Sequence, residues 1–376
     1  MTATLHIKND IFQMVLSQIS ADGKRKQKWI STGLHTKGNK RKAESVMKDL
    51  LLEYENSTVV LSKDILFTDF ILDWLETIKN NVEVNTYECY KDIISRYVLT
   101  YFNDKKTTLR QLEPIHIQQM YNHYIQQGLS PTTVLKFHAN VRKALQHAVK
   151  MNLITYNPAD RVEKPKKQKF NASFYDDEQI NKLLSALKDE PMYSAVLLTS
   201  FYGLRRSEIL GLRWQDVDFK NKTITICNTV TEYKTVVEKK RTKNQSSLRT
   251  LPLVTEIENY LIQLQKEQTD SKAYFGDEYA DNDFVCKRSN GEAFRPNYLT
   301  ERFGKLLKRH GLPKIRFHDL RHSSASLLLS KGFSLKEIGE WLGHADIGTT
   351  ANIYAHVQFK AKQGMADSIG NSLKVS

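Results

Sequence analysis

The chain has 376 residues with 56 Lys and Arg against 42 Asp and Glu, a formal net charge of +14 that favours a polyanionic partner, first of all nucleic acid. Three scattered cysteines, Cys89, Cys227 and Cys286, lack CxxC spacing, which argues against a disulfide framework and against a cysteine zinc site. No stretch approaches the roughly 18 uninterrupted apolar residues of a membrane helix, and residues 1–6 lack a signal-peptide layout, so we expect a soluble cytoplasmic protein without membrane contact.

The length allows two or three domains, and the first expected domain is a small three-stranded sheet followed by a helix. Residues 4–34 alternate apolar and polar positions around a turn at residues 21–23, which predicts antiparallel strands. Residues 40–55 repeat apolar side chains at spacings of three and four, which predicts a helix. The strands and turn carry basic residues that suit a sheet laid against a DNA groove, or that form only a solvated basic hairpin: Lys24, Arg25, Lys26 and Lys28, beside Trp29.

The second expected domain is an all-α bundle of four helices. Amphipathic patterns predict these helices at residues 67–75, 87–97, 114–125 and 131–151. Ser130 and Pro131 stand as N-cap and first residue of the last helix. A basic, proline-bearing linker follows at residues 164–169, where we place a domain boundary. Its lysines, Lys166 and Lys167 among them, either solubilise a tether or contact DNA phosphates between two domains.

The third expected domain, from residue 170, is mainly helical with a small strand section. The strand section follows an acidic helix start at residues 175–178 and an apolar helix around residues 195–198. Residues 222–226 and 249–254 read as strands that flank a polar turn or loop at residues 239–247. Helices are expected to continue to the end, which gives an α+β class.

Four short motifs carry the chemistry. Residues 203–208 and 317–322 each contain an arginine at a helix start, residues 341–344 end in a histidine, and residues 349–356 contain a lone tyrosine between small and polar residues. A phosphodiester under attack gains negative charge on its non-bridging oxygens, and guanidinium groups bind those oxygens bidentately while staying charged. The pattern therefore indicates phosphodiester chemistry with the tyrosine as nucleophile.

In this order and spacing, the motifs resemble those of the tyrosine recombinases, or phage integrases, and within them the conjugative-transposon and phage integrases with an N-terminal arm-binding domain. The resemblance is strong over residues 174–356, moderate over 64–165 and weaker over 1–56. It implies an arm-type DNA-binding domain at residues 1–56, a SAM-like helical core-binding domain at 64–165 and a catalytic domain at 170–376.

The resemblance also implies a role for each motif residue. Arg205 and Arg321 would clamp the scissile phosphate, His318 and His344 would bind it or shuttle a proton, and Lys243 would be the general acid. Tyr354 would be the nucleophile, forming a 3′-phosphotyrosine without ATP or any cofactor. Glu208 would orient the basic cluster, although Arg205 and Glu208 could instead form only a surface ion pair.

A metal site is the alternative reading of one helix. His318 and His322 have the i,i+4 spacing of a helical zinc pair, but Asp319 stands where a metallohydrolase needs Glu, and no third ligand is evident. We therefore expect no metal. Trp341 is expected in the core, since residues 335–342 form an apolar helix face opened by the capping box of Ser334 and Glu337.

These observations predict a site-specific DNA recombinase that integrates and excises a mobile element. Its expected partners are double-stranded DNA at core and arm attachment sites, three further protomers in a homo-tetramer, and an excision factor, in a prokaryotic cytoplasm beside the nucleoid. The tail at residues 357–376 would dock on a neighbouring protomer or on its own domain. The alternatives are a type IB topoisomerase and a catalytically silent DNA-binding regulator.

Overall fold

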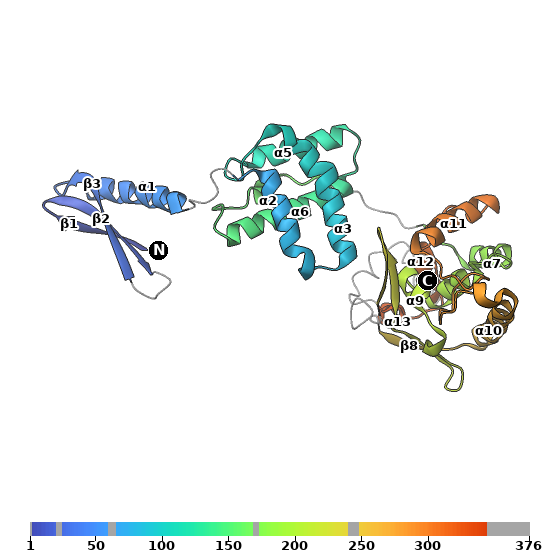
Figure 1. The fold of residues 1–376 in the computed structure, drawn as a ribbon. Coiled ribbons are helices and arrows are strands. Elements are labelled where there is room, and N and C mark those ends of the chain that lie inside the picture. The colour runs from blue at the N-terminus through green and yellow to red at the C-terminus, as the bar shows by residue number, and fades with distance from the viewer. Residues whose placement is uncertain (1, 20–24, 59–64, 168–172, 240–247, 344–376) are drawn as a thin grey trace, which may run out of the picture. The chain divides into compact units, whose positions relative to one another are not determined.

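The computed structural model describes residues 2–19, 25–58, 65–167, 173–239 and 248–343. The chain divides into two compact units, an N-terminal unit of Met1–Gln168 and a C-terminal unit of Lys169–Ser376 (Figure 1). Within the described ranges, every helix is too short or too polar to span a lipid bilayer.

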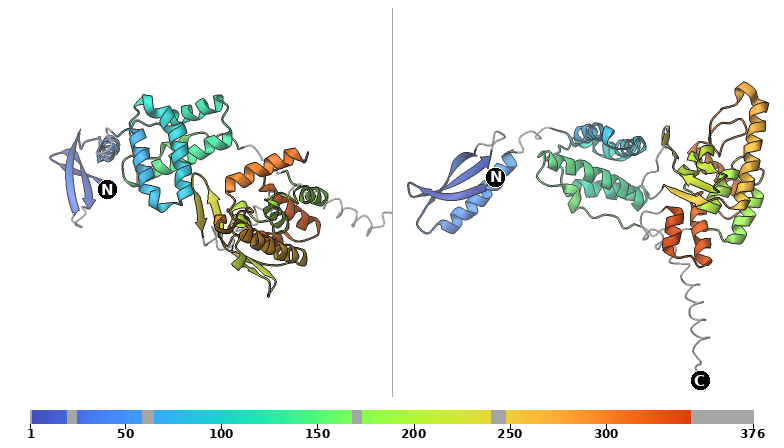
Figure 2. Two further views of the ribbon diagram at one scale, coloured as in Figure 1. Left: turned by 45° about the vertical axis from the view of Figure 1, so that its right-hand side comes forward. Right: turned by 90° about the horizontal axis from the view of Figure 1, so that it is seen from below.

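The N-terminal unit opens with a sheet module of three strands and one helix. The antiparallel strands β1 (Thr2–Lys8), β2 (Ile11–Ile19) and β3 (Arg25–His35) lie in sequence order, and α1 (Lys40–Thr58) packs against the sheet (Figure 2). Met14 and Leu16 are buried together with Ala43 of α1, which identifies the covered face. Directly paired residues share a face, so Val15 and Trp29 lie on the opposite one. The expected sheet-plus-helix module is confirmed.

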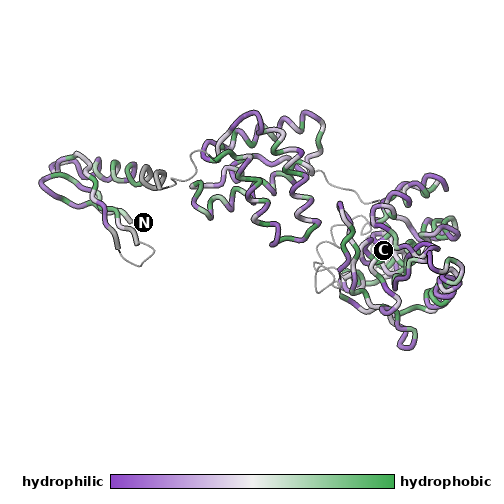
Figure 3. Tube along the Cα trace, in the orientation of Figure 1, coloured by the Kyte–Doolittle hydropathy of each residue, from purple (hydrophilic) through white to green (hydrophobic). Residues whose placement is uncertain are grey.

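The rest of the N-terminal unit is a helical bundle. It contains α2 (Phe67–Ile78), α3 (Val84–Ile93), α5 (Pro114–Gln126) and α6 (Pro131–Lys150), and α3 continues through a π-helix (Ile94–Leu99) into α4 (Thr100–Phe102). Hydropathy alternates within each helix (Figure 3) because one face enters a shared core. Ser130 caps α6 as predicted, with its hydroxyl accepting from the Thr133 N–H. The expected four-helix bundle is therefore present.

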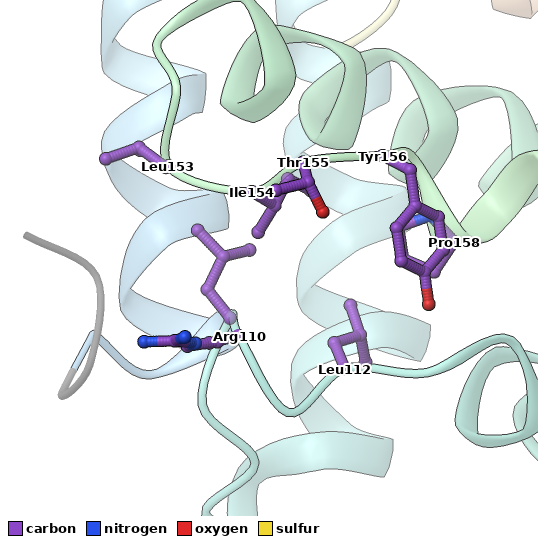
Figure 4. Close-up of a pocket in the computed structure, with 8 residues that line it drawn as sticks. Arg110, Leu112, Leu153, Ile154, Thr155, Tyr156 and Pro158 are labelled. Atoms are coloured by element: carbon purple, nitrogen blue, oxygen red, sulfur yellow. The ribbon is translucent and has the colours of Figure 1, made fainter. Parts of the chain in front are cut away.

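A pocket of about 260 Å³ lies in the bundle between the segment before α5 and the segment after α6 (Figure 4). None of its lining residues belongs to the set that the sequence assigns to catalysis or DNA binding. These residues are Leu109, Arg110, Leu112, Leu153, Ile154, Thr155, Tyr156 and Pro158.

The C-terminal unit is mainly helical around one apolar core. Its helices are α7 (Asp177–Ala186), α8 (Tyr193–Tyr202), α9 (Arg206–Gly211), α10 (Thr255–Phe275), α11 (Pro296–Arg309), α12 (Asp319–Ser330) and α13 (Leu335–Leu342). The strands β4 (Val217–Asp218), β5 (Thr223–Ile226) and β8 (Arg249–Pro252) form one antiparallel sheet. A second hairpin, β6 (Thr229–Glu232) with β7 (Val236–Lys239), was not predicted. The expected α+β class is confirmed.

Gly203 allows α13 to approach the start of α9. It ends α8 in the left-handed conformation, with φ of 61°. A Cβ at this position would lie 2.3 Å from Cδ2 of Leu342 at the end of α13. Because a side chain would both strain the backbone and displace Leu342, this contact requires glycine.

Candidate active site

Arg205 is held at the start of α9 by that helix's own capping. It is the N-cap residue, and its backbone N–H donates to Oε2 of Glu208 at 3.0 Å. Its Nη1 donates to Oε1 of the same carboxylate at 2.5 Å. The short sequence between Gly203 and Glu208 thus sets both the backbone and the guanidinium of Arg205.

Glu208 is the centre of a buried charge cluster. Its side chain is 1% exposed, so the Arg205–Glu208 contact is no surface ion pair. Arg249 of β8 donates from Nη2 to Oε2 at 3.0 Å, and Nη1 of Arg321 lies 3.9 Å from Oε2. Burial alone would raise the pKa of Glu208, but the charges of Arg249 and Arg205 and their hydrogen bonds outweigh burial and lower it. Glu208 therefore stays anionic.

Arg321 is buried on α12 and is 1% exposed. Its Nη1 donates to the carbonyl of Gly203 at 2.7 Å, and its Nη2 donates to the carbonyl of Leu342 at 2.7 Å. One guanidinium thus joins the end of α8 to the end of α13.

The three arginines together bind the last turn of α13. Nε of Arg249 donates to the Trp341 carbonyl at 2.8 Å, and Nη2 of Arg205 donates to the Gly343 carbonyl at 3.0 Å. With the Arg321–Leu342 bond, three successive carbonyls receive a charged donor. A helix C-terminus leaves its last carbonyls without helical partners and carries partial negative charge, so cations are favoured there.

His318 is the N-cap residue of α12, three residues before Arg321. Its imidazole meets that of His322 edge-on, with ring centroids 5.1 Å apart. Desolvation by the surrounding protein, and then the charges of His322 and Arg321, lower the pKa of His318 to about 4. His318 is therefore neutral at pH 7 and can accept a hydrogen bond or a proton.

The histidine pair has no metal-binding surroundings in the described part of the chain. Asp319 is paired with Arg316, whose Nη2 lies 2.6 Å from Oδ1. Among the described residues, no group of three His, Cys, Asp or Glu side chains is arranged to hold a metal ion.

Three of the predicted catalytic residues lie outside the described residues. Lys243 falls in residues 240–247, between β7 and β8, while His344 and Tyr354 fall in residues 344–376. The described chain ends at Gly343, whose carbonyl is bound by Arg205. The structure therefore brings together Arg205, Glu208 and Arg321, and it places His318 on the helix that carries Arg321.

Comparison with known proteins places this chain in a family. A sequence model described as the phage integrase family matches residues 173–361, half of the chain. The chain belongs to the phage integrase family. A second model, the N-terminal SAM-like domain of phage integrases, matches residues 66–125 in the helical bundle.

Relatives of this integrase-family chain span most of its length. A XerC-like tyrosine recombinase of Caldanaerobacter subterraneus subsp. tengcongensis is 28% identical over 354 residues, covering 88% of this chain and 90% of the relative. The ICEBs1 integrase of Bacillus subtilis is 24% identical over 338 residues, covering 89% of this chain and 90% of the relative. The resemblance to the tyrosine recombinases is confirmed.

Solved integrase structures share the fold. The Tn1549 transposon integrase, in complex with a circular intermediate DNA, has a TM-score of 0.66 at 21% identity and covers 81% of this chain and 100% of its own. A lambda integrase tetramer bound to a Holliday junction has a TM-score of 0.57 at 17% identity and covers 91% of this chain and 95% of its own.

Arg249 is the member of the integrase cluster that sequence reasoning missed. It was assigned no role from the sequence. It is 7% exposed and contacts both Glu208 and α13. A signal for Arg249 was available, because it is the only charged residue of the strand Arg249–Pro252. A charged side chain in a strand is either exposed to solvent or paired with an opposite charge.

The predicted DNA-binding residues of the sheet module lie only partly within the described residues. Lys28 pairs with Leu16 on the side covered by α1, whereas Trp29 pairs with Val15 on the open side. Lys24 lies outside the described residues, and Arg25 and Lys26 are described only as part of the β3 backbone. Lys28 and Trp29 therefore lie on opposite faces of the sheet, because side chains alternate along a strand, and DNA binding by the basic residues stays a prediction.

The remaining expectations concern the linker and one tryptophan. Lys166 and Lys167 are exposed after the helical bundle. Trp341 stacks on Tyr202, with ring centroids 5.9 Å apart, and packs against the apolar core. The predicted capping box of Ser334 and Glu337 starts α13.

Proposed function

We propose that this chain is a site-specific DNA recombinase that integrates and excises a mobile genetic element. Its family membership supports a DNA breaking-and-rejoining enzyme. The observation that carries the proposal is the meeting of Arg205 and Arg321 on Glu208 beside the carbonyl of Gly343. From that point the chain continues directly into His344 and the motif that holds Tyr354.

In the proposed reaction, the phenolic oxygen of Tyr354 attacks the scissile phosphorus and forms a 3′-phosphotyrosine bond. The bond from phosphorus to the 5′ oxygen breaks, and Lys243 donates the proton that this oxygen needs. Free tyrosine has a pKa near ~10, so the attack requires a proton acceptor and a positive site. Neutral His318 supplies an acceptor, with His344 beside the phosphate.

Arg205 and Arg321 stabilise the pentacoordinate species, whose non-bridging oxygens carry the extra negative charge. Because the phosphotyrosine stores the energy of the broken bond, a 5′ hydroxyl of a different strand can reverse the steps without ATP. The same chemistry needs no metal and no cofactor.

Two other functions are disfavoured. A type IB topoisomerase would share the tyrosine chemistry, but the relatives of this chain are named integrases and recombinases. A silent DNA-binding regulator has no need for three arginines around one buried carboxylate, a costly arrangement for stability alone.

We assign DNA contacts to three domains: residues 1–56 to arm sites, and residues 64–165 and 170–376 to the core site. The match of the SAM-like model supports the second assignment. Lys136, Lys143 and Lys150 are exposed on α6 and recur every seven residues, so they line one face of that helix and can reach phosphates. Lys166 and Lys167 would extend this contact along the linker.

We also propose that the chain acts as a tetramer on DNA, since exchange between two duplexes requires four tyrosines, and the lambda integrase neighbour is a tetramer on a Holliday junction. An excision factor would set the direction. The setting would be a prokaryotic cytoplasm, in contact with the nucleoid.

The test is the Tyr354→Phe variant on a nicked suicide duplex that carries the core site from the ends of the element. The wild-type chain should form a covalent adduct, while Tyr354→Phe should bind the duplex within a few-fold of wild type and form none. Tyr274→Phe is the matched control, since Tyr274 is 85% exposed on α10. Adduct formation by Tyr354→Phe, or an adduct mapped to a different tyrosine, would refute the assignment.

A further inference from the structure

We propose that Arg249 is a positioning residue of the cleavage reaction, which holds Glu208 and the end of α13 so that Arg205 and Arg321 are oriented before DNA binds. The inference rests on the proposed function, because it concerns the clamp that would bind the scissile phosphate. Arg249 would not touch the phosphate itself.

The geometry of Arg249 gives it two fixed ends. Its backbone is the first residue of β8 and pairs with Ile226 of β5, so the main chain is held by the sheet. Its side chain binds the Glu208 carboxylate through Nη2 at 3.0 Å and the Trp341 carbonyl through Nε at 2.8 Å. The planar guanidinium can serve two acceptors at once in a fixed geometry, which a lysine ammonium on a flexible stem cannot reproduce.

Arg249 also determines which groups lie closest to the Glu208 carboxylate. Oε2 accepts from the Arg205 N–H and from Arg249, both at 3.0 Å, while Arg321 stays at 3.9 Å. Without Arg249, the carboxylate would lose one of its two strongest partners and turn toward Nη1 of Arg321. Since that nitrogen now donates to the Gly203 carbonyl, Arg321 would leave its present orientation.

The charge of the cluster matches the proposed transition state. Three guanidinium groups and one carboxylate leave these four side chains with a net charge of +2. A pentacoordinate phosphorane with two ionised oxygens carries −2. Replacing Arg249 with a neutral residue would lower the cluster charge to +1 and would allow Glu208 to neutralise Arg321, so preorganised stabilisation of the transition state would fall.

A purely structural role makes a different prediction. Residues that orient metal ligands through hydrogen bonds typically affect activity by about 10- to 100-fold, and we expect the same range for a residue that orients catalytic guanidinium groups. The loss should depend on the charge of the phosphate. If Arg249 only stabilised the fold, its removal would slow cleavage equally whatever the charge on the substrate. A methylphosphonate at the scissile position separates the two, because a methyl group replaces one ionised oxygen and reduces the charge that must be stabilised.

The experiment measures single-turnover cleavage of the suicide duplex and of its methylphosphonate form by the full chain. The variants are Arg249→Met, Arg205→Ala as the clamp reference, and Arg302→Met as the matched control. Arg302 also donates from Nη2 to a glutamate Oε2 at 3.0 Å, but the glutamate is Glu190, outside the cluster. Duplex affinity and melting temperature are measured for every variant.

We expect Arg249→Met to cleave the phosphate duplex about 10- to 100-fold more slowly at unchanged affinity. On the methylphosphonate, both Arg249→Met and Arg205→Ala should approach the wild-type rate. Arg302→Met should match wild type on both. A wild-type rate on the phosphate duplex, or equal slowing on both substrates, would overturn the inference.

Arg249→Lys covers the case in which Arg249→Met does not fold. It keeps one positive charge but cannot hold Glu208 and the Trp341 carbonyl together, so it should also slow cleavage of the phosphate duplex selectively. Full activity of Arg249→Lys would contradict the positioning role. If the wild-type chain itself forms no adduct, the proposed function fails first, which distinguishes that outcome from failure of the Arg249 inference.

Discussion

Arg321 should matter for stability as much as for chemistry, and the structure gives the size of the effect. In Arg321→Gln, the side chain is too short to reach both the Gly203 and Leu342 carbonyls, each of which now accepts at 2.7 Å. A hydrogen bond from a charged donor contributes about 1.5–3 kcal/mol, so the loss of two costs about 3–6 kcal/mol. For a folding unit of about 200 residues, this corresponds to a fall in melting temperature of roughly 6–24 °C.

The assay is calorimetry of the full chain, combined with hydrogen–deuterium exchange of peptides from α12 and α13. Exchange assigns the shifted transition to the C-terminal unit, because these two helices are held by the lost bonds. The control is Arg309→Gln. Arg309 is 60% exposed and pairs with Glu190, which keeps Arg302 as a second partner, so the loss of Arg309 should cost about 1 kcal/mol or less.

The reasoning would be refuted if Arg321→Gln melted no lower than Arg309→Gln. It would also be refuted if protection in α12 and α13 were unchanged, since the Arg321 bonds would then not hold the two helices together.

Three further predictions follow from the site and the sheet module. Cleavage should persist in excess EDTA, because the positive field comes from side chains, and strict dependence on an added divalent ion would contradict this. In the free chain, the imidazole of His318 should titrate near pH 4, because desolvation and the charges of His322 and Arg321 lower its pKa. The contribution of neutral His318 to the free energy of unfolding is therefore complete above pH 6.5 and declines as the pH falls from 6.5 toward 4. NMR of its ring proton, assigned with His318→Gln, measures this, and a midpoint near 6.5 would disprove it. Trp29→Ala, on the open face of β3 and 48% exposed, should weaken binding to arm-site DNA and leave the core-site footprint intact, whereas loss of both footprints would show that the sheet module is not a separate arm reader.

The sequence predicted those features that depend on neighbours along the chain. The caps at Ser130 and Ser334 were correct because an N-cap hydroxyl binds the backbone two or three residues later, within one turn. The β6–β7 hairpin was missed because its strands are four residues each and contain Glu232 and Glu238, which weaken the alternating apolar signal. The helical bundle was correct because its helices are long and amphipathic.

Contacts between distant segments could not be predicted in the same way. Arg249 and Glu208 are 41 positions apart, and nothing in either local sequence states that the two side chains meet. The faces of β3 depended on register, since a shift of one residue would move Lys28 to the open side. A sequence motif also identifies side chains only, whereas the groups that accept hydrogen bonds from the three arginines at the end of α13 are backbone carbonyls.

Those carbonyls connect the arginine cluster to the segment that contains Tyr354, the proposed nucleophile. Arg205, Arg249 and Arg321 come from α9, β8 and α12, and each donates to one carbonyl in the last turn of α13. The residue after this turn is His344, and Tyr354 follows ten positions later. An arginine that moves to bind a phosphate therefore pulls on, or releases, the point from which the tyrosine segment starts. In the proposed reaction, phosphate binding and placement of the nucleophile would be linked through the same guanidinium groups, so a variant of any one arginine should be interpreted with its effect on α13 measured alongside its effect on cleavage.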